Sequence, residues 1–337
     1  MSPVPKVRLS GGLEICRVLN GMWQVSGAHG AVNNPKAVEA MQAYVDAGLT
    51  TFDMADIYGP AEDIFGQFNN QRCKSGNSTP GLQSLTKYVP RPGPMDRKVV
   101  LKALQRSMAR MHVDNLDCVQ FHWWDYRDKR YLDALGHLSD LQQEGLIREL
   151  SLTNFDTQRL EEITSRGIRI SSNQVQYSLI DQRPAARMEQ FCVANNIQLL
   201  TYGTLAGGLL SERYLGKTEP NSKAELYTAS LSKYKKMIDS WGGLEPFPGP
   251  PRCLGDRCQD TRLLGGQCSN ALRAGPPCGG RGHRGLPAGH LWGRAAPQRH
   301  SAELQPRPDA DGGRSRRHRD SDTTLQGPHG TPRGLRG

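Results

Sequence analysis

An aspartate, a tyrosine, a lysine and a histidine stand at or just beyond the ends of β-rich runs in the first half of the chain: Asp53, Tyr58, Lys87 and His122. Tyrosine has a reference pKa of about 10, so it is a weak acid at neutral pH. A neighbouring lysine ammonium stabilises the phenolate and lowers that pKa, and a carboxylate such as Asp53 would hold the lysine charged. A histidine could donate a hydrogen bond to a carbonyl oxygen and orient it. The chemistry that suits these four side chains is the reduction of a carbonyl group.

Each of these residues alone has a simpler interpretation. An aspartate or lysine at a strand end is more often a solvated or capping group, and a histidine in an apolar run is more often a hydrogen-bonded core residue. The joint pattern is what favours the catalytic interpretation.

Strands and helices alternate along the part of the chain that carries these residues. The expected strands are 21–26, 50–55, 82–88, 116–123, 147–154, 170–177 and 197–203, and the expected helices are 36–47, 61–70, 97–112, 128–144, 157–166 and 183–195. The spacing of Leu101, Leu104 and Met108 is typical of a buried helix face. Such alternation predicts parallel strands joined by right-handed crossovers.

A glycine-rich phosphate loop does not follow the first expected strand, in either the G-x-G-x-x-G or the G-x-x-x-x-G-K-[ST] form. This favours a (β/α)8 TIM barrel, of the α/β class, over a dinucleotide-binding or P-loop sheet. In a barrel the C-terminal strand ends form one mouth, where the four side chains would meet. Seven strands can be placed before residue 204, and an eighth is not found.

Length and composition exclude several classes of protein. The 337 residues fit one large α/β barrel. A run of about 18 apolar residues is missing, so we expect no membrane span, and the first residues lack the apolar region of a secretory signal. The eight cysteines show no secreted-type framework, which favours a reducing compartment and a cytoplasmic location.

The positive charge is concentrated in the last part of the chain. Residues 244–337 hold 15 Arg, no Lys and 8 acidic residues, and so supply +7 of the net charge of +10. They also hold 12 of the 22 Pro and 17 of the 37 Gly, with no Ile, Val, Met or Tyr. We therefore divide the chain into a nearly neutral α/β part, 1–243, and an Arg/Gly/Pro-rich tail, 244–337.

Six stretches of the front part resemble the aldo-keto reductase superfamily, in the order in which that family has them. They are GLTTFDMADIYGPAEDIFG (48–66), LTKYVPRPGP (85–94), LDCVQFHWWD (116–125), LSLTNF (150–155), NQVQYS (173–178) and LLTYGTLAGGLL (199–210). The resemblance covers residues 15–243. It implies an NADP-dependent enzyme that reduces an aldehyde or ketone to an alcohol.

The resemblance also implies a role for each site residue. The catalytic tetrad would be Asp53, Tyr58, Lys87 and His122, with Tyr58 as general acid and NADPH as hydride donor. The cofactor would contact Asp53, Thr153, Asn154, Gln174, Tyr202 and Leu205, with Tyr202 stacked on the nicotinamide ring and Leu205 beside the pyrophosphate. The substrate pocket would be lined by Trp23, Trp123 and Trp124. Tyr202 alone could be a core residue, Asn154 alone could be a helix N-cap, and the tryptophans could pack at the barrel rim.

The tail departs from the family, which has a helix, an eighth strand and another helix there, the strand and its loop gripping the adenosine 2′-phosphate. A disordered tail, a basic nucleic-acid arm and a zinc segment are three interpretations, although Cys253, Cys258, Cys268 and Cys278 are spaced unlike common zinc modules. A fourth is translation in the wrong frame. Dropping one base allows residues 259–263 to read Lys-Thr-His-Gly, where the family has a helix that ends in a similar phrase. We favour a frameshifted or mis-spliced C-terminus that begins near Gly243.

A barrel with seven strands has open edges, so we expect this chain to fold poorly and to bind NADPH weakly. The expected partner is a small carbonyl compound, with no metal, nucleic acid or membrane partner; the substrate and the oligomeric state stay open. The alternative function is a non-catalytic NADP-fold binding protein whose basic tail contacts acidic partners. The nucleotide sequence across codons 243 and 244 would decide the origin of the tail.

Overall fold

The computed structural model describes residues 3–75, 81–214, 217–240 and 242–244. The chain divides into two compact units, Met1–Trp292 and Gly293–Gly337, and every described residue belongs to the first. The expectations for residues 245–337 therefore lie outside the described residues.

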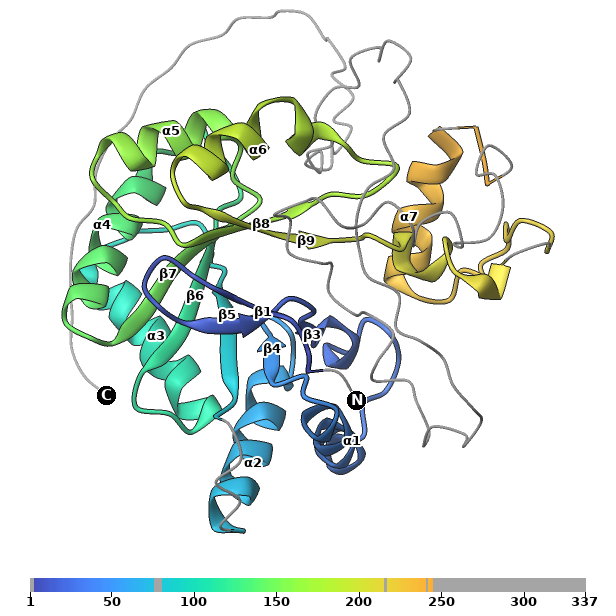
Figure 1. Cartoon of the computed structure of the whole chain (residues 1–337), viewed down its shortest axis with the longest axis horizontal. Coiled ribbons are helices and arrows are strands. Elements are labelled where there is room, and N and C mark those ends of the chain that lie inside the picture. The colour runs from blue at the N-terminus through green and yellow to red at the C-terminus, as the bar shows by residue number, and fades with distance from the viewer. Residues whose placement is uncertain (1–2, 76–80, 215–216, 241, 245–337) are drawn as a thin grey trace, which may run out of the picture. The chain divides into compact units, whose positions relative to one another are not determined.

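A parallel sheet of seven strands forms the centre of the described part (Figure 1). Its strands follow the chain order: β3 (Asn20–Gly21), β4 (Thr51–Asp53), β5 (Gln83–Tyr88), β6 (Leu116–His122), β7 (Ile147–Thr153), β8 (Ser172–Gln176) and β9 (Gln198–Tyr202). Within the described residues, β3 and β9 are the two ends of this sheet. The expected α/β barrel of about seven strands is confirmed.

Helices connect the successive strands. They are α1 (Asn34–Asp46), α2 (Ala61–Lys74), α3 (Arg97–Met111), α4 (Arg130–Gln143), α5 (Thr157–Ser165) and α6 (Arg183–Ala194), and α7 (Ala229–Ser240) follows β9. Aspartates begin two of them: Asp96 accepts a hydrogen bond from Val99 N and Asp156 from Arg159 N. The six helices expected from the sequence are confirmed, with boundaries shifted by a few residues. No helix among the described residues is both long and apolar enough to cross a membrane.

The first expected strand, 21–26, is wrong over most of its length. β3 ends at Gly21, and Trp23–Val25 form a 3-10 turn in which Val25 N donates to Met22 O at 3.2 Å. Met22 and Val25 are buried, so burial, rather than strand pairing, explains the apolar run. The turn brings the Trp23 ring to 5.0 Å from that of Tyr58.

An antiparallel hairpin, β1 (Lys6–Arg8) and β2 (Glu14–Cys16), precedes the sheet and was not expected. Its loop is held by Glu149 of β7, whose carboxylate accepts hydrogen bonds from Gly11 N and Leu13 N, both at 2.9 Å. Apolar hairpin residues pack against side chains from three sheet strands, namely Leu85, Cys118 and Leu200. The hairpin thus covers part of the barrel interior.

Candidate active site

Asp53 and Lys87 form a buried ion pair inside the barrel. Lys87 Nζ lies 2.7 Å from Asp53 Oδ2, and their side chains are 4% and 1% exposed. Lys87 Nζ also donates to Met54 O at 3.0 Å. The pair forms because β4 and β5 are parallel neighbours whose C-terminal ends meet. Burial lowers the pKa of Lys87, but Asp53 and Tyr58 together raise it by more than that, so Lys87 stays charged.

Tyr58 lies in the loop between β4 and α2, beside this pair. Lys87 Nζ is 5.1 Å from the centroid of its ring. Burial raises the pKa of Tyr58, and the charge of Lys87 acts in the opposite direction. The expected effect of the lysine on the phenol is therefore present, but burial outweighs it. Tyr58 is protonated at neutral pH and has a cation next to it that stabilises a phenolate when one forms.

His122 ends β6 and faces the same cavity as Tyr58 and Lys87. Burial and the charge of Lys87 lower the pKa of His122 to about 4. At neutral pH its imidazole is uncharged and carries one N–H donor. The ring of Trp124 packs against it edge-on at 4.8 Å.

Two glutamine amides hold the second oxygen of Asp53. Gln120 Nε2 donates to Asp53 Oδ1 at 2.6 Å and Gln174 Nε2 at 2.9 Å, and Gln174 Nε2 also lies 2.9 Å from Gln120 Oε1. Gln174 was expected at the site, but Gln120 was missed. It stands two residues before His122 on β6 and so shares its side of the strand. That spacing is the signal that could have identified it.

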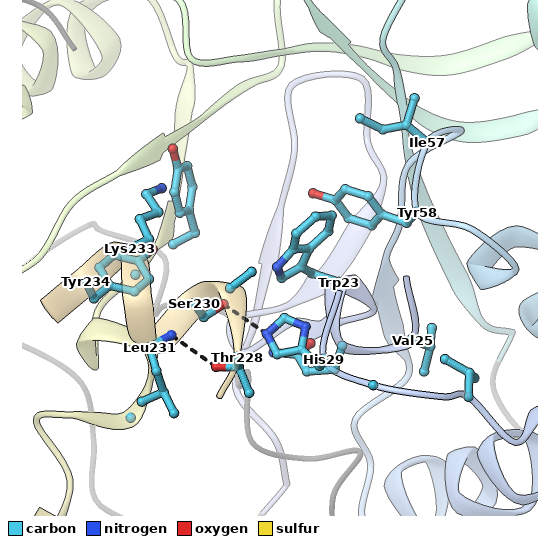
Figure 2. Close-up of a pocket in the computed structure, with 18 of the residues that line it drawn as sticks. Trp23, Val25, His29, Ile57, Tyr58, Thr228, Ser230, Leu231, Lys233 and Tyr234 are labelled. Carbon is cyan, nitrogen blue, oxygen red and sulfur yellow. Dashed lines mark hydrogen bonds between the residues drawn. The ribbon is translucent and has the colours of Figure 1, made fainter. Parts of the chain in front are cut away.

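A cavity of about 1180 Å³ opens above these residues. The expected residues that line it are Trp23, Tyr58, Lys87, His122, Trp124, Thr153, Asn154, Gln174 and Tyr202. Figure 2 shows Trp23 and Tyr58 on one wall and Lys233 and Tyr234 of α7 on the opposite wall. Two of the expected residues do not line the cavity. Asp53 is buried and contacts Lys87, which does line it, and Leu205 is 41% exposed.

Trp123 does not line this cavity, so the prediction that it lines the substrate pocket is corrected. Its side chain is buried, and its Nε1 donates to Asp125 O at 2.9 Å and to Asp128 O at 3.0 Å. The two tryptophans follow the end of β6 at His122, and Trp123 is buried whereas Trp124 is 54% exposed. Trp123 packs in the core beside Phe121 and contacts, with Trp124, a second cavity of about 130 Å³.

The expected cofactor residues form a connected group at the ends of β7, β8 and β9. Asn154 Oδ1 accepts a hydrogen bond from Tyr202 Oη at 3.0 Å, and Asn154 N donates to Gln174 O at 2.8 Å. The N-cap of α5 is Asp156, so the capping interpretation of Asn154 is wrong. Thr153 Oγ1 is buried without a hydrogen-bond partner among the described residues. A buried hydroxyl of this kind fits a ligand that supplies the missing partner.

The α7 wall of the cavity was missed, because no helix was expected after residue 203. His29 Nε2 lies 3.1 Å from Ser230 Oγ and links the β3–α1 loop to α7. Lys233 Nζ lies 5.2 Å from the Tyr202 ring centroid, and burial lowers the pKa of Lys233.

Comparison with known proteins gives the same family over the same residues. The aldo/keto reductase family profile matches residues 17–243 and ends where the composition changes. The chloroplastic pyridoxal reductase of Arabidopsis thaliana is 25% identical over 245 residues, 66% of this chain and 66% of the relative, just under two thirds of its length. The glyoxal reductase of Bacillus subtilis is 26% identical over 233 residues, 69% of this chain and 75% of the relative.

A solved structure shares the fold. The Bombyx mori aldo-keto reductase in complex with NADP superimposes with a TM-score of 0.53 at 23% identity, covering 69% of this chain and 77% of that one. The family profile spans well over half of the 337 residues. The chain belongs to the aldo/keto reductase family.

Proposed function

We propose that this chain reduces an aldehyde or ketone to an alcohol with NADPH, and that Tyr58 is the proton donor. The observation that carries the proposal is the buried Asp53–Lys87 pair beside Tyr58, at the wall of a cavity that His122 also faces. A half-buried acid next to a held cation is suited to giving up a proton during a reaction.

The tetrad residues have separate tasks in this mechanism. The neutral imidazole of His122 donates its N–H to the carbonyl oxygen and orients the substrate. Tyr58 Oη then transfers its proton to that oxygen as the carbonyl carbon is reduced. Lys87 stabilises the phenolate left on Tyr58, and Asp53 keeps Lys87 charged and in place.

NADPH is proposed to lie against the ends of β7, β8 and β9. Thr153 Oγ1, which is buried without a partner among the described residues, supports the fit, and Asn154 and Gln174 line the same wall. Tyr202 would stack on the nicotinamide and Leu205 would lie near the pyrophosphate. When bound, NADPH supplies the hydride that the carbonyl carbon receives. The NADP-bound Bombyx mori relative is consistent with this choice of cofactor.

The proposed substrate is a small carbonyl compound held between Trp23 and Trp124. Both tryptophans line the cavity, and Trp124 is 54% exposed. An apolar wall beside a few fixed polar groups is typical of small-molecule sites. We further propose a cytoplasmic location, on the cysteine usage described above.

Impaired cofactor binding is part of the proposal. β3 and β9 are not joined to each other or to a further strand within the described residues. We propose that residues 1–243 carry the function and that this opening weakens NADPH binding. Micromolar NADPH affinity together with one sharp cooperative unfolding transition would contradict the impairment.

The test is NADPH oxidation with a panel of aldehydes, comparing the full chain with Tyr58→Phe. Activity should fall by about 10²–10⁴ while NADPH binding is retained. Tyr131→Phe is the control, because Tyr131 is a buried tyrosine away from the cavity. It loses a hydrogen bond to Glu162 Oε2 at 2.7 Å and one from Lys129 Nζ at 3.3 Å. Activity that survives Tyr58→Phe contradicts the role of Tyr58. NADPH binding without turnover of any aldehyde favours a non-catalytic binding protein.

A further inference from the structure

The Arg110 side chain contacts residues on both sides of Tyr58 in the chain. Arg110 Nη1, from the end of α3, donates to Asp56 O at 3.1 Å and lies 3.2 Å from Glu62 Oε2. Asp56 precedes Tyr58 by two residues and Glu62 follows it by four. Ile57 and Tyr58 lie between these two attachment points and line the cavity (Figure 2).

The same segment is fixed to β5, the strand of Lys87. Asp56 N donates to Lys87 O at 3.0 Å, and Val89 N donates to Asp56 Oδ1 at 3.2 Å. Glu62 Oε1 accepts from Thr86 Oγ1 at 2.6 Å. The distance between Tyr58 and Lys87 therefore depends on how this segment is held.

Close packing of α2 on α3 allows Arg110 to reach both groups. Gly66 stands one turn after Glu62 on α2, and a Cβ there would collide with the carbonyl oxygen of Arg110. A glycine at this position lets the two helices approach, so a long side chain from α3 can extend across the start of α2.

The carboxylates beneath the segment require a cation. Glu62 is 1% exposed, and the Asp56 side chain is 4% exposed. Burial and the neighbouring Glu62 raise the pKa of Asp56 to about 7. Removing Arg110 would leave the buried Glu62 carboxylate without its ion pair, and an unpaired buried charge is costly enough to move the surrounding backbone.

We propose that Arg110 is a positioning residue: by bridging Asp56 and Glu62 it holds the loop that carries Tyr58 at its working distance from Lys87. The consequence for catalysis rests on the proposed function of Tyr58. Arg110 does not line the cavity, so it acts through the loop and not on the substrate.

Arg106 provides a matched control on the same helix. It stands one turn before Arg110, its side chain is 56% exposed, and its Nη2 lies 3.6 Å from Asp56 Oδ2. Arg106→Met thus removes a cation from the same cluster but leaves the bridge across the loop intact.

The test compares Arg110→Met, Arg110→Lys and Arg106→Met in the full chain. Arg110→Met should lower kcat by about 10²-fold, the effect of a misplacement of about 1 Å, with KM for NADPH changed by less than about threefold. Arg110→Lys, which keeps the charge, should recover most of kcat, and Arg106→Met should retain it. Equal losses in Arg110→Met and Arg106→Met, or a loss only in KM, would overturn the proposal.

A spectroscopic measurement separates this proposal from the proposed function. Fluorine NMR of protein labelled with 3-fluorotyrosine reports the position of Tyr58, once its resonance is assigned with Tyr58→Phe. The resonance should shift in Arg110→Met and stay in place in Arg106→Met, even if the wild type reduces no carbonyl. If Arg110→Met does not fold, the double variant Arg110→Met/Glu62→Gln removes the stranded charge and should still show the shift. An unchanged resonance in a folded variant without Arg110 overturns the proposal.

Discussion

Lys87 Nζ lies 2.7 Å from Asp53 Oδ2, and both side chains are withdrawn from water. The other oxygen of the Asp53 carboxylate accepts hydrogen bonds from the buried side chains of Gln120 and Gln174. A buried pair of this kind is favourable only when the hydrogen bonds around it are complete. The pair places a fixed cation beside the half-buried phenol of Tyr58.

Lys87→Met should destabilise the fold by about 3–5 kcal/mol, because the Asp53 charge then has no cation. The double variant Lys87→Met/Asp53→Asn should recover much of that loss, since the uncharged amide still accepts from the glutamines. Neither variant should reduce a carbonyl. Urea unfolding of the full chain measures the stabilities, and a double variant as unstable as the single one would show that the charge is not the cause.

Gln120→Glu should destabilise the protein increasingly as the pH rises. The new carboxyl group would lie where Gln120 Nε2 now donates to Asp53 Oδ1 at 2.6 Å. Two carboxyl groups this close share a proton, so the folded-state pKa of the pair is raised and its stability is lost as the pH rises through that pKa. Gln120→Leu removes the donor without adding a charge and is the control. The free energy of unfolding, measured at several pH values, should fall with rising pH for Gln120→Glu. For Gln120→Leu it should be lower than wild type by the same amount at every pH.

The alternation of strands and helices could be predicted because each strand is a short β-rich run and each helix has one apolar face. Asp53, Lys87 and His122 could be placed together for the same reason, since parallel strands end at one mouth. Their meeting follows from topology and needs no knowledge of the side-chain packing.

What was missed depends on contacts between residues far apart in sequence. The β1–β2 hairpin is held by Glu149, more than a hundred residues later. Arg110 contacts Asp56 and Glu62 because α3 packs against α2, and the α3 sequence alone does not predict this packing. The place of Trp123 beside Phe121 and Tyr131 likewise depends on packing that the sequence does not show.

Asp56→Asn should stabilise the protein more at pH 8 than at pH 5. The folded pKa of Asp56 is raised to about 7, above the unfolded value of 3.8, so the folded state holds more protons between these values. The stability that wild type gains from this group is present at low pH and lost as the pH rises through 7. Asparagine does not titrate and can still accept from Val89 N. The difference in unfolding free energy between variant and wild type, measured at both pH values, checks the sign.

The acid side of the kcat profile should stay flat from neutral pH to about pH 5. His122 has its pKa lowered to about 4, so its uncharged form persists well below the ordinary value of 6.5. His122→Gln keeps an N–H donor that does not titrate, and it should retain part of the activity with the same flat profile. A tenfold fall in kcat per pH unit beginning near 6.5, present in wild type and absent in the glutamine variant, would contradict the neutral histidine.

Thr153→Val should raise the stability of the free protein and weaken NADPH binding at the same time. Thr153 Oγ1 is buried without a partner among the described residues, so replacing the hydroxyl by a methyl group removes an unmet hydrogen bond. The same change deletes a group proposed to contact the cofactor, and a lost hydrogen bond of about 0.5–1.5 kcal/mol corresponds to about a two- to twelvefold weaker affinity. Thr201→Val, a buried threonine on β9 that does not line the cavity, is the control. Thermal unfolding without cofactor and NADPH titration by fluorescence measure the two effects. A variant that is less stable and binds NADPH as well as wild type would show that this hydroxyl serves the fold and not the cofactor.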